Sequence, residues 1–213
     1  MQRGSHPRGL AIMGSSSRAL FFHHHTNITN MKRNIIGAIV AGILIMAWQT
    51  ASHTFLNLNA AQEQYTPNQL ANLEVLSQNL DAKGQYFLPT VPPGSSMDAY
   101  EKLAEASMGK PYASIIYNPV MDYNMGMNLF RGLGTNILLG VVLVWLLGKL
   151  RVNSMGGIVT ACLGISFIAF CFYPYPGFIW YEIPGIWVEL FDGLVAFGLA
   201  GLWLGWWMTR KGA

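Results

Sequence analysis

Four long apolar stretches constrain the fold of this chain more than any other feature. They run from Asn34 to about Phe55, from Gly132 to Leu150, from Ser154 to Phe172, and from about Ile186 to Met208. A helix needs about 20 residues to cross a hydrocarbon core of roughly 30 Å. Backbone polar groups in lipid must bond internally, and the short alternating segments of a barrel are missing, so we expect four transmembrane helices. The charged fraction of 11% agrees with this.

The predicted fold class is an all-α membrane protein with a small α+β or helical domain inserted between the first two spans. We divide the chain into residues 1–30, a first span at 31–58, an extracytoplasmic domain at 59–127 and three further spans at 128–213. Residues 1–30 are polar and free of acids, and we expect them to be disordered. They are an extension upstream of a natural start at Met31 or, alternatively, a targeting peptide.

The basic residues predict the orientation of the spans. Lysine and arginine flank three helix ends, at Lys32 and Arg33, at Lys149 and Arg151, and at Arg210 and Lys211. Such residues accumulate on the cytoplasmic side of membranes, where we therefore place both termini. Aromatic residues cluster at both proposed interfaces, which agrees with this topology. The first apolar run is too long for a cleavable signal peptide, so we expect it to be retained. The predicted location is a bacterial inner membrane.

The segment at 59–127 has its own pattern. Thr66 and Pro67 are typical of a helix start, and Gly84 of a helix end. An extended, proline-rich connection follows, and Ser95 or Ser96 then caps a second helix over MDAYEKLAEASMG. YASIIYNP has the content of a short strand. A unit of this size is marginally stable alone, so we expect it to lean on the membrane helices.

Polar residues inside the spans form the candidate site. An ionisable residue in a span is costly and is by default a functional hypothesis. The candidates lie toward the extracytoplasmic side and comprise Gln49, His53, Asn128, Arg131, Asn136, Glu189 and Asp192. We expect Arg131 to pair with Glu189 or Asp192, because a guanidinium bonds a carboxylate with two parallel hydrogen bonds. His53, near that charge, would allow proton-dependent behaviour. The alternative is a structural role, or placement at the headgroup level.

Other chemical signals are weak. Cys162 and Cys171 lie nine residues apart on one span, too far apart in depth and direction to form a disulfide, and are small apolar fillers in our interpretation. No metal motif, nucleophile motif or phosphate loop occurs, so no cofactor is predicted. No basic patch interleaved with aromatics indicates a nucleic-acid partner. Gly201 and Gly205 permit close helix packing, which leaves homo-oligomerisation open.

Several segments of residues 31–213 resemble a family. These are GAIVAGILIMAWQ in the first span, QYFLPTVPPGSSMDAYEKL and GKPYASIIY in the insertion, NMGMNLFRG before the second span, and GLAGLWLGWWM in the last. Together they resemble an uncharacterised family of small bacterial four-helix inner-membrane proteins with a periplasmic insertion. The resemblance implies no activity, and no functional residue follows from it.

Three functions fit these patterns. The first is a non-enzymatic accessory protein in the bilayer, whose extracytoplasmic domain binds a protein partner. The second is a small oligomeric transporter or channel component that uses the polar residues as a path. The third is a membrane-embedded enzyme acting on a lipid or hydrophobic substrate, which would need a nucleophile or metal set that the sequence does not offer convincingly. We favour the first.

Overall fold

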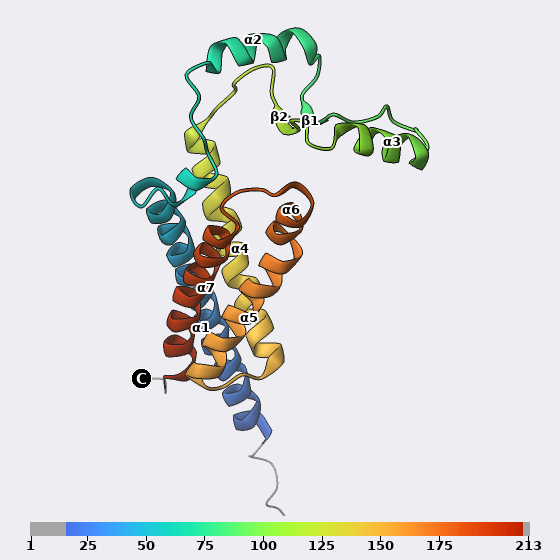
Figure 1. Ribbon diagram of the computed structural model, residues 1–213. Helices are drawn as coiled ribbons and strands as arrows, with labels where there is room; N and C mark the ends of the chain where they lie inside the picture. Colours follow the sequence, from blue (N-terminus) through green and yellow to red (C-terminus); the bar gives the residue numbers. More distant parts are fainter. Residues whose placement is uncertain (1–15, 211–213) are drawn as a thin grey trace, which may run out of the picture.

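The structure is a computed structural model that describes residues 16–210, with side chains described from Met31 onward except at Ala61. Its elements, in chain order, are α1 (Ser16–Thr50), the π-helix η1 (Ala51–Phe55), the 3-10 helix η2 (Leu58–Ala61), α2 (Gln69–Asn79), β1 (Gly84–Leu88), α3 (Met97–Ser107), β2 (Ala113–Tyr117), α4 (Met125–Leu150), α5 (Met155–Phe172), α6 (Pro174–Tyr181) and α7 (Ile186–Thr209). Figure 1 shows a helical bundle that carries a smaller unit at one end.

Within residues 16–210, four helices are long and apolar enough to cross a membrane, which confirms the four predicted spans. They cover Met31–Phe55, Met125–Leu150, Met155–Tyr181 and Ile186–Thr209. Helix α1 packs against both α4 and α7, and α7 packs against α5. We call the end of the bundle that carries α2, β1, α3 and β2 the insertion side, and the end with the α4–α5 turn the opposite side (Figure 1).

The helices that contain the first and second spans begin earlier in the chain than expected, at Ser16 and Met125. Residues 16–30, predicted to be disordered, are helical and lead into the first span; they contain neither glycine nor proline, so nothing in them interrupts the helix. Residues 1–15 of the predicted extension lie outside the described residues. Helix α4 starts at Met125 because the Asn124 side chain accepts a hydrogen bond from Met127 N at 3.0 Å and caps it.

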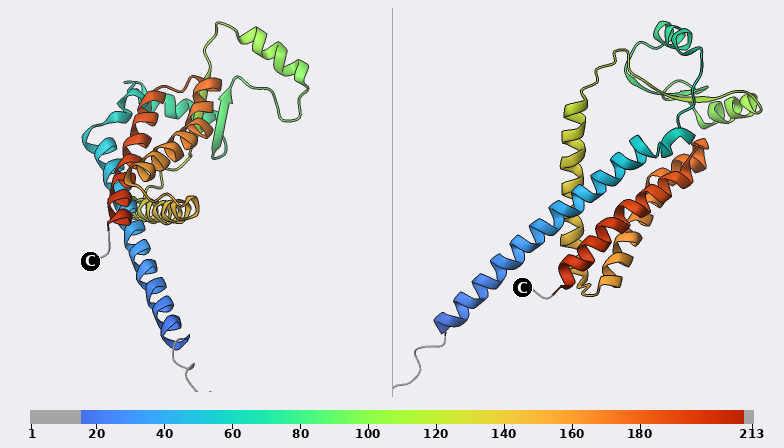
Figure 2. Two further views of the ribbon diagram at one scale, coloured as in Figure 1. Left: turned by 90° about the horizontal axis from the view of Figure 1, so that it is seen from below. Right: turned by 90° about the vertical axis from the view of Figure 1, so that its left-hand side faces the viewer.

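Glycines bring α1 and α4 into backbone contact. A Cβ atom on Gly42 would lie 2.6 Å from the Cα of Ile137, and one on Gly140 would overlap the carbonyl oxygen of Ala38. Small residues at a crossing let two membrane helices approach closely. On either side of this crossing the two helices diverge (Figure 2). The crossing therefore fixes where α1 and α4 are close and where they are apart.

On the opposite side, α1 is fastened to the end of α7. The Arg33 guanidinium donates to the carbonyls of Trp207 and Arg210, both at 2.5 Å, and Trp207 Nε1 donates to the Arg33 carbonyl at 2.8 Å. The Arg210 guanidinium in turn lies 4.3 Å from the centre of the Trp207 ring. A cation at the last carbonyls of a helix satisfies acceptors that the helix leaves open.

The insertion is a small α+β unit, as predicted. Strands β1 and β2 pair antiparallel, with Gly84 opposite Tyr117 and Leu88 opposite Ala113. Ser96 is the residue that caps α3: its Oγ accepts from Ala99 N at 3.4 Å. Thr66 is not the cap of α2, since the helix starts at Gln69 after Asn68, and Gly84 begins a strand rather than ending that helix.

The insertion has almost no core of its own. Between Gln62 and Asn124 only Tyr117 is buried, and neither α2 nor α3 contains a buried residue. The expected contact with the membrane helices is small and involves α6. The Phe87 and Tyr181 rings lie 5.4 Å apart, and Tyr112 OH donates to the Tyr181 carbonyl at 3.3 Å.

Candidate functional site

The structure divides the predicted polar residues into separate groups. The first joins α1 to α4. Asn136, which is 3% exposed, donates from Nδ2 to Gln49 Oε1 at 2.7 Å. The same Nδ2 lies 3.5 Å from the Met46 sulfur. This amide pair lies beside the glycine crossing, since the Asn136 carbonyl faces Gly42. Each amide supplies the hydrogen bond that the other would otherwise lack in an apolar environment.

The second group joins α1 to α7. Trp48 Nε1 donates to Asp192 Oδ1 at 2.7 Å, and His53 Nε2 lies 4.0 Å from Asp192 Oδ2. On the other edge of the imidazole, Asn59 Nδ2 lies 2.6 Å from His53 Nδ1. A chain of polar contacts thus runs from η2 to α7.

A local change in helix geometry places His53 in this chain. Residues Ala51–Phe55 form a π-helical turn at the end of α1, and Asn57 then takes a left-handed conformation with φ of 47°. The π turn shifts the faces of the residues that follow it, and such turns are frequent at functional sites. The left-handed residue starts the bend that returns Asn59 toward the histidine.

The third group joins the insertion to α7. Gln62 Nε2 donates to Glu189 Oε1 at 2.7 Å. Gln62 also lies against Gly185, where a Cβ atom would come within 2.5 Å of its side chain, and φ of 79° favours glycine. Glu189 therefore interacts with the chain that leaves the first span, and not with Arg131.

The predicted ion pair of Arg131 with Glu189 or Asp192 is not formed. Over residues 31–210, the only side-chain ion pairs within 4.0 Å are the His53–Asp192 contact and Lys102–Asp98. Arg131 and Asn128 lie on the first two turns of α4, and both are exposed. Helix α4 packs mainly against α1, whereas the two carboxylates are on α7, so the sequence pattern did not predict which helices are neighbours.

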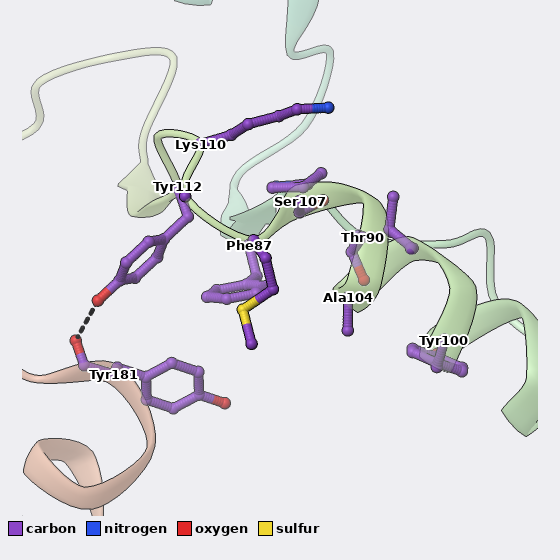
Figure 3. Close-up of a pocket in the computed structure, with 12 residues that line it drawn as sticks. Phe87, Thr90, Tyr100, Ala104, Ser107, Lys110, Tyr112 and Tyr181 are labelled. Carbon is purple, nitrogen blue, oxygen red and sulfur yellow. Dashed lines mark hydrogen bonds between the residues drawn. The ribbon is translucent and has the colours of Figure 1, made fainter.

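A further cleft lies between the insertion and α6, and no sequence pattern predicted it. It has a volume of about 650 Å³. Its wall is mainly apolar and aromatic, with Phe87, Pro89, Tyr100, Leu103, Ala104, Met108, Tyr112 and Tyr181. In Figure 3 the labelled Phe87, Ala104 and Tyr100 lie along α3 and β1 on the side facing Tyr181, while Lys110 extends away from them. The Tyr112–Tyr181 hydrogen bond closes one end.

Within the part of the chain that the structure describes, no three His, Cys, Asp or Glu side chains could hold a metal ion. No buried side-chain nitrogen or oxygen among these residues lacks a hydrogen-bond partner. The cleft offers apolar surface with few polar groups, which suits the side chains of a ligand or partner.

No family model matches the chain, and no curated protein or solved structure matches it. The resemblance to a bacterial inner-membrane family therefore stays a prediction. The fold itself defines the class: the chain is an integral membrane protein with four spans and a small α+β insertion between the first two.

Proposed function

We propose that this membrane protein is a non-enzymatic accessory protein that binds a partner protein through its insertion. One observation carries the proposal: the large apolar side chains of the insertion face solvent. The exposed fractions are 82% for Leu70, 83% for Met108, 78% for Ile116 and 90% for Met121. Large apolar side chains exposed outside the membrane spans are typical of an interaction site.

The cleft between α3 and α6 is the proposed docking point. It has a volume of about 650 Å³ and aromatic walls. Aromatic residues are enriched among the interface residues that contribute most of the binding free energy. Tyr181, on the α6 side, ends the third span, so an occupant of the cleft lies beside the bilayer. We therefore propose an apolar segment of another membrane protein as the occupant.

The polar contacts of the bundle fit a structural role in this proposal. Gln49 with Asn136 holds α1 to α4, and Trp48 with Asp192 holds α1 to α7. Because these groups are bonded to each other, they favour helix attachment over a transport path. The orientation follows the basic residues: the opposite side, with Arg33 and Arg151, faces the cytoplasm, and the insertion faces outward from a bacterial inner membrane.

Native mass spectrometry after gentle release from the natural membrane tests the proposal. Ala104 lines the cleft and is exposed, so Ala104→Phe fills the cleft without burying a new side chain in the fold. Ala106 is exposed on the same helix and does not line the cleft, so Ala106→Phe is the matched control.

The wild type and Ala106→Phe are expected to retain one protein partner at fixed stoichiometry, and Ala104→Phe to lose it. A partner retained by all three chains would contradict the role of the cleft. A protein released only as a homo-oligomer, or without any partner, would contradict the accessory function.

A further inference from the structure

A groove on the opposite side of the bundle lies between α1 and α4. Its volume is about 570 Å³, within the roughly 300–1,000 Å³ typical of ligand sites. Its lining residues are Met31, Asn34, Ile35 and Ala38 from α1, and Val141, Val144, Trp145, Gly148 and Lys149 from α4. The groove belongs to neither the polar contacts nor the cleft described above.

The groove follows from the glycine crossing. The helices touch where Gly140 meets Ala38, and they separate from there toward the opposite side (Figure 2). Ala38 and Val144 are buried and form the floor, whereas Ile35, Val141 and Trp145 remain about half exposed along the walls. Gly148 adds no side chain, and a Cβ built there meets nothing within 4 Å. The floor and walls are thus apolar and open toward the surrounding lipid.

The polar end of the groove is basic. Lys149 lines its mouth, and Arg151 follows directly after α4. Lys32 lies between the lining residues Met31 and Asn34 in the sequence of α1. The sequence has no acidic residue in 1–62, in 123–181 or in 193–213, so the segments that form this side carry only positive formal charge. The groove thus joins an apolar trough within the bilayer to cations at its surface.

We propose that this groove binds an anionic phospholipid of the leaflet on the opposite side. One acyl chain lies in the trough over Ala38 and Val144, and the phosphate headgroup lies against Lys149. Trp145 lies one helical turn from that lysine, at the depth where tryptophan side chains prefer the interface. Basic pockets between helices at a membrane surface select anionic headgroups, because the apolar part alone does not distinguish one phospholipid from another.

Four chains in nanodiscs test this proposal. The discs contain equal amounts of phosphatidylcholine and phosphatidylglycerol, and native mass spectrometry counts the lipids that stay bound to the ejected full-length protein. Lys149→Gln removes the headgroup contact. Gly148→Leu fills the trough at a position where the added Cβ meets no atom. Gly134→Leu is the matched control, since that glycine of α4 is equally free of contacts and does not line the groove.

The wild type and Gly134→Leu are expected to retain phosphatidylglycerol in preference to phosphatidylcholine. For Lys149→Gln that preference falls roughly fivefold, the factor that one lost cation near an anionic membrane surface corresponds to. Gly148→Leu loses the bound lipid of either kind. A wild type without preference, or a preference that survives both groove substitutions, would overturn the proposal.

Discussion

The bundle and the insertion differ in how far their apolar side chains are buried. In the bundle, Ile45, Leu147, Ile158 and Leu204 are almost completely buried between helices, and the remaining apolar surface is available to lipid. In the insertion, α2 and α3 contain no buried residue, and Leu70, Leu73 and Met97 are exposed. The contrast indicates that the bundle is stabilised by its own packing, whereas the insertion has little packing of its own; under the proposed function, a partner protein supplies the surface that the insertion lacks.

The glycine crossing should give the largest effect on stability. In Gly140→Ala the new methyl group overlaps the Ala38 carbonyl, so α1 and α4 must move apart. We expect a loss of roughly 1–3 kcal/mol in the free energy of unfolding, as for other overpacked sites. Thermal unfolding in detergent measures it. Gly134→Ala is the control and should be neutral or stabilising by up to about 1 kcal/mol. Equal effects of the two changes would show that the crossing is not close-packed.

The contact between α1 and α7 should give an intermediate effect. Trp48→Phe keeps an aromatic ring but removes the N–H that bonds Asp192. Hydrogen bonds between membrane helices contribute roughly 0.6–2 kcal/mol, and we expect a loss in that range. A double-mutant cycle with Asp192→Ala, which removes the acceptor, measures the coupling. Additive effects of the two substitutions would contradict a direct bond between these side chains.

Arg131 should contribute less to the free energy of unfolding than an arginine in a membrane helix usually would. The structure gives it no ion pair, and its side chain is exposed, so Arg131→Ala should change the free energy of unfolding by no more than about 0.5 kcal/mol. Chemical denaturation in mixed micelles checks this value. A loss of unfolding free energy as large as that of Trp48→Phe would contradict this and would support the ion pair with Glu189 or Asp192 that was predicted from the sequence.

The insertion should give the smallest effect on stability. Leu70 is 82% exposed, so Leu70→Gln removes no packing and should change the free energy of unfolding by no more than about 0.5 kcal/mol. The same thermal unfolding experiment measures it. A clear destabilisation would show that α2 already has an apolar partner within the chain, and would remove the distinction between the two regions.

The sequence predicted the elements well and the contacts between them only in part. Apolar run length is enough to define the four spans, and Ser96 with its helix followed from capping chemistry. Helical spacing assigns a residue to a face of its own helix but does not give the angle between helices. The crossing at Gly42 and Gly140 sets that angle and brings Asn136 to Gln49, and α4 packs mainly against α1 rather than α7.

Two other features of the structure could not be predicted from patterns in the sequence. Trp48 was missed because an indole in a span is usually counted as apolar, although its buried N–H requires an acceptor, here Asp192. The cleft between α3 and α6 depends on residues about seventy positions apart, Tyr112 and Tyr181, and no local pattern links them.

Hydrogen–deuterium exchange tests the contrast between bundle and insertion most directly. The purified protein in nanodiscs is compared with the protein in its natural membrane, peptide by peptide. We expect residues 69–79 and 97–107 to exchange at nearly unprotected rates in the nanodisc and to become protected in the natural membrane. The exchange rates of α1, α4 and α7 should be the same in both. Strong protection of α2 and α3 in the purified protein would contradict the account, because the insertion would then hold its structure without a partner.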